Sequence, residues 1–298
     1  MKYIKAALVT IALTAFAVMP AAYAATSPSL GTAASFSVLG ETNITNVPTS
    51  SIARDVGLSP ATGANYSGIT QAQVGGTIYA VDGFGPSGSV NNPGLLTTAI
   101  NDMMAVWSTG GSTGIDQPCT NDYSGTGVKD LTTVSPLGPG VYCADAFILT
   151  GNLTLSGSGV WIFKSASTIT TSAASTVTGG DPCNIWWRLV SAGSIIGSNS
   201  TFEGNILAGT SLALQTGATL NGRALAQAAV TLDHNTISGP VCATTTSTPA
   251  ASSTPTPGLP NTGSAASKNS NSPTTIVSTI LALALVSLLA RRYGSKLE

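Results

Sequence analysis

The chain has 298 residues, of which only 8% are charged, and a formal net charge of −1 at pH 7. Eleven acidic residues but only five basic ones lie between Ala25 and Thr262, and the basic ones are scattered: Arg54, Lys129, Lys164, Arg188 and Arg223. A nucleic-acid partner requires a basic stripe and a membrane-surface helix requires a basic amphipathic face, so we expect neither.

The first 24 residues have the layout of a secretory signal peptide. Lys2 and Lys5 precede the apolar run 6–18, and Ala22-Tyr23-Ala24 forms a small-residue cleavage site. The apolar run is too short to span a bilayer comfortably, which makes an uncleaved anchor the weaker alternative. We therefore expect residues 1–24 to be removed and the exported protein to begin at Ala25.

The other end resembles a sortase cell-wall sorting signal of the LPxTG type. The pentapeptide 259–263 is followed by a polar spacer, the apolar run 276–290 and a basic tail, within the segment 259–298. An apolar run halts export and a cationic tail stays inside the cell. The resemblance implies cleavage between Thr262 and Gly263, with sortase and peptidoglycan as partners. An unprocessed signal would instead leave a transmembrane anchor, and both readings place the protein outside the cell.

Between these ends the chain divides into a domain and a stalk. Residues 243–258 are rich in Thr, Ser and Pro and lack apolar residues to bury, which predicts a disordered, extended stalk. Residues 25–242 remain as one domain, large enough for a substantial core.

All four cysteines fall in this domain, as expected for disulfides in an exported protein. The sequence allows three pairings. We favour Cys119 with Cys143 and, as the second pair, Cys183 with Cys242. No Cys-x-x-Cys pair is present and His234 is the only histidine, so neither a zinc site nor a cofactor is expected.

One helix is predicted after residue 92. Asn92-Pro93 is a cap followed by proline at the first helical position, and Gly110-Gly111 ends the segment. Between them an apolar stripe at helical spacing predicts packing along the outside of another element; it comprises Leu95, Leu96, Ala99, Ile100, Met103, Met104 and Trp107.

A repeated four-residue phrase, Thr-apolar-x-Gly, indicates the architecture of the rest. It begins at Thr154, Thr176, Thr201, Thr219 and Thr236. Short apolar stretches flank each phrase, which gives about three strands per repeat of roughly eighteen residues, as a three-sided β-solenoid requires. An immunoglobulin-like sandwich would show hairpin signals but not this recurrence. We therefore predict an all-β solenoid.

The same phrase predicts a hydroxyl-rich face. If its apolar residues point inward, alternation turns the neighbouring residues outward, and stacking places them in columns about 4.8 Å apart. The first predicted column is Thr154, Thr176, Thr201, Thr219 and Thr236, and the second is Ser156, Thr178, Glu203, Asn221 and Ser238. Methyl and hydroxyl groups at such a repeat suit the ordering of water in an ice-like array, although threonine is also common on exposed strands of proteins with other functions.

Longer stretches resemble the DUF3494 family of microbial ice-binding proteins. They are LGTAASFSVL at 30–39, DVGLSP at 55–60, PGVY at 139–142, FEGNILA at 202–208, TGATLNGRALA at 216–226 and VTLD at 230–233. The resemblance spans about residues 30–242. It implies a right-handed β-solenoid of triangular section, with coils out of sequence order, a long helix alongside and a flat ice-binding face. Thr216-Gly217-Ala218-Thr219 matches a phrase found at the site of some members, so we place the site first at Thr176, Thr201, Thr216 and Thr219.

Two other functions remain as alternatives. Some β-solenoids cleave polysaccharides with clustered acids, for which Asp233, His234 and Arg223 are the candidates. A general acid–base pair needs two groups positioned together, whereas acids here are scattered singly, so we predict that the protein is not an enzyme and that His234 is a turn residue. A wall-anchored adhesin for glycan or protein would fit the anchor and stalk equally well. We expect a monomer.

Overall fold

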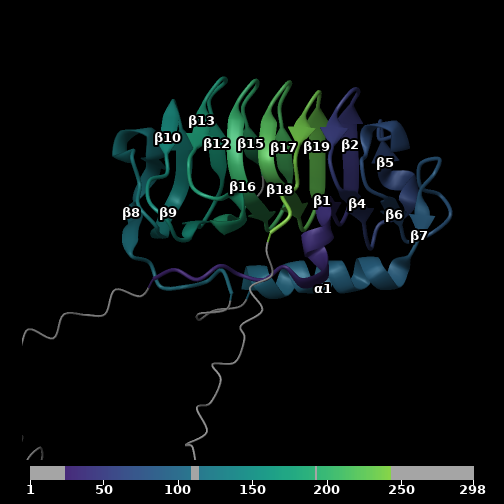
Figure 1. The fold of residues 1–298 in the computed structure, drawn as a ribbon, viewed down its shortest axis with the longest axis horizontal. Helices are drawn as coiled ribbons and strands as arrows, with labels where there is room; N and C mark the ends of the chain where they lie inside the picture. Colours follow the sequence, from purple (N-terminus) through teal and green to yellow (C-terminus); the bar gives the residue numbers. More distant parts are fainter. Residues whose placement is uncertain (1–23, 109–113, 192, 243–298) are drawn as a thin grey trace, which may run out of the picture. The chain divides into compact units, whose positions relative to one another are not determined.

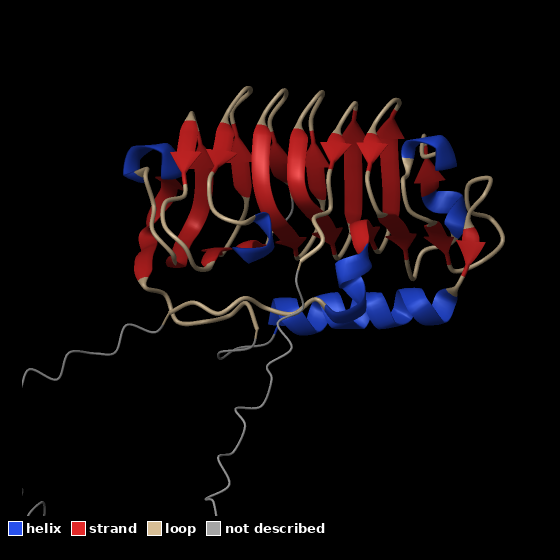
Figure 2. Cartoon of the chain, in the orientation of Figure 1, coloured by secondary structure: helices blue, strands red, loops and turns tan. Residues whose placement is uncertain are grey.

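The computed structural model describes residues 24–108, 114–191 and 193–242, and there the chain forms a parallel β-solenoid with one α-helix beside it (Figures 1 and 2). The chain divides into two units, residues 1–244 and 245–298, and the described residues all belong to the first. The predicted stalk, the sorting signal with Thr262 and Gly263, Gly110-Gly111 and nearly all of the signal peptide lie outside the described residues.

Three ladders of parallel strands make up the solenoid, and we call them faces A, B and C. Face A contains β8 (Asn121–Asp130), β9 (Gly140–Leu149), β11 (Trp161–Ser165), β14 (Ile185–Leu189), β16 (Thr201–Ala208), β18 (Thr219–Ala226), β1 (Phe36–Gly40), β4 (Asp55–Leu58), β6 (Ile78–Ala80) and β7 (Val90–Asn91). Face B continues from β8 and β9 into β12 (Ile169–Thr171), β15 (Ser194–Ile196), β17 (Leu212–Leu214), β19 (Ala229–Asp233), β2 (Asn43–Val47) and β5 (Tyr66–Ser67). Face C contains β10 (Asn152–Thr154), β13 (Thr176–Thr178), the first halves of β16 and β18, β20 (Thr236–Ile237) and β3 (Ser51–Ile52).

The coils are not stacked in sequence order. The chain starts inside the stack with β1–β3 and proceeds to one end at β7. It then passes through α1 to the other end at β8, and returns coil by coil to β18–β20. There the last coil pairs with the first, through β18 with β1, β19 with β2 and β20 with β3. We call this junction the seam; it confirms that the coils are out of sequence order, as the resemblance implied.

Side chains that alternate inward fill the solenoid. A row of aromatic rings in contact runs through successive coils. Ring centroids are 5.2 Å apart for the stacked pair Tyr142 and Phe163, 4.0 Å for the stacked pair Phe163 and Trp187, and 4.7 Å for the tilted pair Trp187 and Phe202. Such pairs add to the stabilisation that burial of their large apolar area provides. Short 3₁₀ helices cover corners and ends at Gly31–Ser35, Gly63–Asn65, Gln71–Gln73, Leu131–Val134 and Pro182–Asn184.

Helix α1 (Pro93–Ser108) covers the outside of face A, as the apolar stripe predicted. The side chain of Asn92 accepts a hydrogen bond from the backbone N–H of Leu95 at 3.1 Å, which caps the first turn. The buried helix residues pack against outward apolar residues of face A, among them Leu39, Ile162, Trp186, Leu207 and Leu225. The stripe differs from the prediction in detail, because Val106 is buried whereas Met104 is 43% exposed.

The repeated phrase by itself located only part of the solenoid. It found the coils after Tyr142, whereas the structure adds the coils of β1–β7 and the terminal strand β8. Those segments lack the Thr-apolar-x-Gly phrase, so no repeat marked them. In the described part of the chain, no helix is long and apolar enough to cross a membrane.

Both favoured disulfides are present, Cys119–Cys143 and Cys183–Cys242. They close loops with sequence separations of 24 and 59, so chain entropy predicts losses of about 3.5 and about 4 kcal/mol, respectively, when each is removed. We expect paired Cys→Ser variants to show both losses in urea unfolding, with the larger loss for Cys183 and Cys242. Equal stability of wild type and either variant would contradict this expectation.

Candidate functional site

Face C presents the polar residues that sequence analysis singled out. In its strands the apolar residues point inward, and Val177, Phe202, Leu220 and Ile237 are fully buried. Their neighbours point outward, as period-two alternation requires. Helix α1 covers the outer side of face A, whereas no comparable element of the described chain covers the outer sides of faces B and C.

The first outward column of face C holds threonine at four successive levels. Thr176 pairs with Thr201, Thr201 with Thr219 and Thr219 with Thr236, so neighbouring side chains are about 4.8 Å apart. The column continues to two residues that sequence analysis missed, Asn152 beside Thr176 and Ser51 beside Thr236. Neither begins the repeated phrase, which explains the omission.

The structure corrects the register of the first phrase. Thr154 was expected beside Thr176, but it pairs with Thr178 in the second column, and Asn152 occupies the expected place. Ser156 lies beyond that column, where its N–H donates to the carbonyl of Leu137. The cause is the preceding corner: only two residues separate Leu149 from Asn152, against four between Thr171 and Thr176, so the chain enters face C two residues earlier.

The second column is Thr154, Thr178, Glu203, Asn221 and Ser238, and its later members are hydrogen-bonded to one another. Ser238 donates to Asn221 at 2.6 Å, and Asn221 donates to the carboxylate of Glu203 at 2.9 Å. In the first column, Thr176 donates to Asn152 at 2.9 Å. The hydroxyls of Thr201, Thr219 and Thr236 have no side-chain partner among the described residues, so they are available to water.

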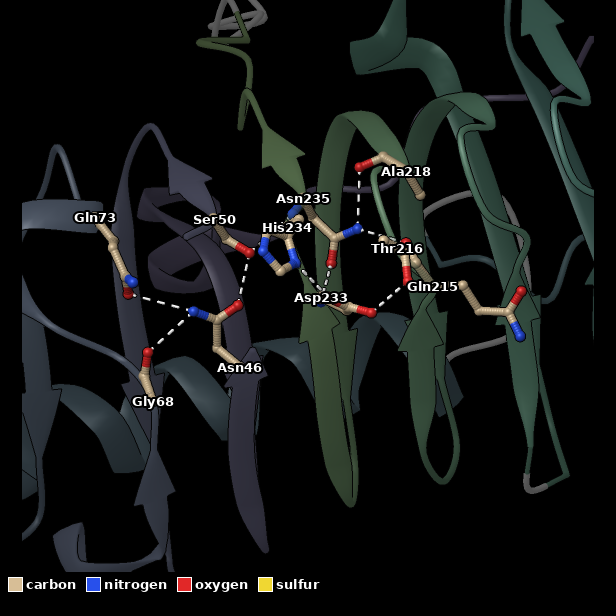
Figure 3. A network of polar contacts seen from close by, with 10 residues as sticks. All are labelled: Asn46, Ser50, Gly68, Gln73, Gln215, Thr216, Ala218, Asp233, His234 and Asn235. Carbon is tan, nitrogen blue, oxygen red and sulfur yellow. Dashed lines mark hydrogen bonds and ion pairs between the residues drawn. The ribbon is translucent and has the colours of Figure 1, made fainter. Parts of the chain in front are cut away.

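The corner between faces B and C carries Thr216, apart from the two columns. Its hydroxyl donates to the carboxylate of Asp233 in the next coil, and His234 Nδ1 lies 2.5 Å from the other oxygen of that carboxylate (Figure 3). The hydrogen bond from Thr216 and that from His234 lower the pKa of Asp233. His234 has a φ of 53°, a left-handed conformation that Gly217 adopts in the preceding coil, which confirms it as a turn residue.

The glycine of the repeated phrase lies at the corner between faces C and A. A Cβ on Gly222 would come within 1.8 Å of the carbonyl oxygen of Gly204, and a Cβ on Gly204 would clash with Ile185. Any side chain at Gly222 would therefore push neighbouring coils apart. The phrase combines an outward threonine, an inward apolar residue and a close backbone contact.

Face B is open but less regular. Its central outward column runs through Ile148, Thr170, Ile195, Ala213, Thr231, Thr45 and Ser67. Only Thr231 and Thr45 are adjacent threonines, and their hydroxyls lie 3.3 Å apart. Face B thus provides no run of hydroxyls comparable to that of face C.

The residues considered for catalysis do not converge. Asp233 and His234 form a pair at the corner between faces B and C. Arg223 is 1% exposed, and donates instead to Asn205 and to the carbonyls of Ala34 and Pro240. In the described residues, no group of three or more His, Cys, Asp or Glu side chains is placed to hold a metal ion.

Glu203, on face C, should make the stability of the folded protein depend on pH. Burial raises the pKa of this carboxyl above its usual value of 4.5, against the hydrogen bond from Asn221. The folded protein then binds this proton more tightly than the unfolded chain, so stability increases as the pH falls from neutral towards 4.5. We expect Glu203→Gln to be more stable than wild type at pH 7, and the gain to shrink at about pH 4 in urea unfolding. Asp116→Asn should instead be less stable than wild type at pH 7, because the hydrogen bond from Lys164 lowers the pKa of Asp116 and its charged form therefore stabilises the fold.

Comparison with known proteins places the chain in a family. The family model for ice-binding-like proteins matches residues 38–238. An ice-binding protein from Flavobacterium frigoris is 39% identical over 220 residues, covering 71% of this chain and 76% of the relative. One from a Colwellia species is 37% identical over 220 residues, covering 71% and 83%. Among solved structures, a glycosylated ice-binding protein from an Arctic yeast matches with a TM-score of 0.62 and 28% identity, over 73% of this chain and 96% of that chain. Because the family match spans well over half of its 298 residues, the chain belongs to the ice-binding-like family.

Proposed function

We propose that this protein binds ice through face C and thereby inhibits ice growth and recrystallisation. The observation that carries the proposal is the column of threonines at four successive levels. Parallel strands pair on both sides of Thr201 and Thr219, so their side chains stand on a rigid backbone at a repeat close to that of the ice lattice. Family membership supports the same function.

Each threonine contributes two groups to the contact. The hydroxyl can anchor a water molecule, and the methyl limits competing arrangements of that water. Because the hydroxyls of Thr201, Thr219 and Thr236 have no side-chain partner among the described residues, water ordered by them need not displace an internal hydrogen bond. The proposed layer of ordered water then merges with the ice surface.

The proposed surface includes the predicted residues on both columns and at the corner. They are Thr154, Thr176, Thr178, Thr201, Thr216, Thr219, Asn221, Thr236 and Ser238, with Ser156 at the margin. The hydroxyl of Thr216 is bonded to Asp233, so Thr216 would offer its methyl and its oxygen lone pairs rather than a donor. Asn152 and Ser51 extend the first column at its two ends.

We also propose the finer features of shape and cellular context. Three ladders meeting at corners support a triangular section, which the family resemblance gives as right-handed. The terminal segments support export, a stalk at 243–258 and attachment to the cell wall through Thr262. A monomer attached in this way could hold a cell to ice, which unites ice binding with the adhesin alternative.

The proposal is tested with a recombinant protein of residues 25–242. We expect it to be enriched in a slowly growing ice hemisphere and to inhibit recrystallisation. A protein without surface affinity for ice, such as serum albumin, serves as the control that remains in the liquid. Folded protein that stays in the liquid with the control would disprove the proposed function.

A further inference from the structure

The corners between faces B and C are built alike in most coils. Counted from the last inward residue of each face B strand, four residues, 172–175, 197–200, 215–218 and 47–50, precede the first outward residue of face C. In three of them a backbone hydrogen bond from an N–H to the carbonyl three residues earlier closes the corner. The pairs are Ser175 with Ser172, Ser200 with Gly197 and Ala218 with Gln215. These corners position the threonines that follow them.

One corner is a residue shorter. Only Asp233, His234 and Asn235 separate Leu232 from Thr236, although Thr236 still pairs with Thr219. The usual turn hydrogen bond is absent here, because the residue three before Asn235 is Leu232 in the strand. The Asn235 N–H instead donates to the hydroxyl of Ser50 at 2.8 Å, across the seam.

The Asn235 side chain occupies the space of the missing residue. Its carbonyl oxygen accepts from the Asp233 N–H at 2.6 Å, and its amino group donates to the carbonyls of Gln215 at 2.8 Å and Ala218 at 3.1 Å (Figure 3). Asn235 is 1% exposed, so these bonds replace water rather than compete with it. The longer corners carry short side chains at this place: Ser175, Ser200, Ala218 and Ser50.

The same residue connects the two sides of the seam. Its backbone carbonyl accepts from the Ser51 N–H at 2.7 Å, and Ser51 continues the first column. Ser50 donates to Asn46 at 2.6 Å, and Asn46 donates to the carbonyl of Gly68 at 3.0 Å. Segments far apart in the sequence are thereby held in one register at this corner (Figure 3).

We propose that Asn235 is the positioning residue of the ice-binding face: its amide replaces the residue missing from the corner 233–235 and keeps Thr219, Thr236 and Ser51 in one column across the seam. This inference rests on the proposed function of face C. Asn235 is buried beneath the surface and acts through the residues that it aligns.

Variants of the full-length protein test the proposal. Asn235→Ser introduces the residue that longer corners carry, without their fourth residue. A second variant adds to Asn235→Ser one glycine inserted after His234, which restores the four-residue length. Ser200→Ala is the matched control. It removes a buried hydroxyl from a corner of normal length, where that hydroxyl donates to the carbonyl of Ser172 at 2.9 Å.

Three measurements are made on each variant: partition into ice, the thermal midpoint, and amide hydrogen exchange at Ser51 and Thr236. For Asn235→Ser we expect a loss of ice partition on the order of tenfold, at temperatures where it remains folded, and faster exchange at both amides. The glycine insertion should restore partition and protection. Ser200→Ala should lower the midpoint without either change.

Several results would overturn the proposal. The first is that Asn235→Ser leaves both hydrogen exchange and ice partition unchanged. The second is that the glycine insertion restores neither of them. The third is that Ser200→Ala loses as much ice partition as Asn235→Ser. If Asn235→Ser does not fold, a folded and protected insertion variant supports the proposal and an unfolded one overturns it. Hydrogen exchange does not involve ice, so wild type that fails to bind ice rejects the proposed function, while the exchange data still decide whether Asn235 sets the register.

Discussion

Thr219→Tyr is expected to reduce partition into ice by on the order of tenfold or more, with little change in the thermal midpoint. Thr219 lies between Thr201 and Thr236, so its replacement affects the centre of the column. A tyrosine ring extends several ångströms beyond a threonine methyl and would hold the ice away from both neighbours. Because Thr219 points outward, the larger side chain need not enter the core.

The matched control is Thr170→Tyr on face B. Thr170 is exposed between buried Ile169 and Thr171, so the two substitutions have the same chemistry on different faces. We expect the control to retain ice binding in the hemisphere assay. Loss of binding in Thr170→Tyr but not in Thr219→Tyr would assign the ice contact to face B and reject face C.

Among single substitutions, Arg223→Met is expected to give the largest loss of stability, about 3 kcal/mol or more. The guanidinium donates to Asn205 at 2.7 Å, to the carbonyl of Ala34 at 3.0 Å and to that of Pro240 at 2.5 Å. Methionine fills a similar volume but would leave these buried and partly buried acceptors without donors, and each unsatisfied buried group costs about 1–3 kcal/mol. Since Ala34 and Pro240 lie on the N-terminal and C-terminal segments, the loss should appear as weakened closure of the seam.

Urea unfolding monitored by tryptophan fluorescence measures this loss. Arg54→Met is the control, because among the described residues its guanidinium makes a single hydrogen bond, from Nε to the carbonyl of Ser35 at 3.2 Å. We expect the control to lose less than about 1.5 kcal/mol. Similar losses in the two variants would show that Arg223 has no special role in closing the seam. Burial lowers the pKa of Arg223 to about 10, so it remains charged at pH 7.

The two disulfides and the helix illustrate what local patterns predict well. A cap, a proline at the first turn and an apolar stripe predicted α1 because helix formation depends on residues three or four apart. Export predicted oxidised cysteines, and the structure pairs them as favoured. The stripe was less accurate at Met104 and Val106, because the apolar residues of face A against which the helix packs, which no local pattern reports, decide which helix residues are buried.

The sequence by itself determined that the chain repeats, which residues alternate, and that threonine faces outward once per phrase. Those features follow from period-two alternation and from glycines at close backbone contacts, which are local. Only the tertiary structure decided that Asn152 rather than Thr154 stands beside Thr176, and that Ser51 joins the column from the other side of the seam. Corner length sets the register between coils and pairing across the seam sets their order, and both depend on contacts between residues far apart in the chain.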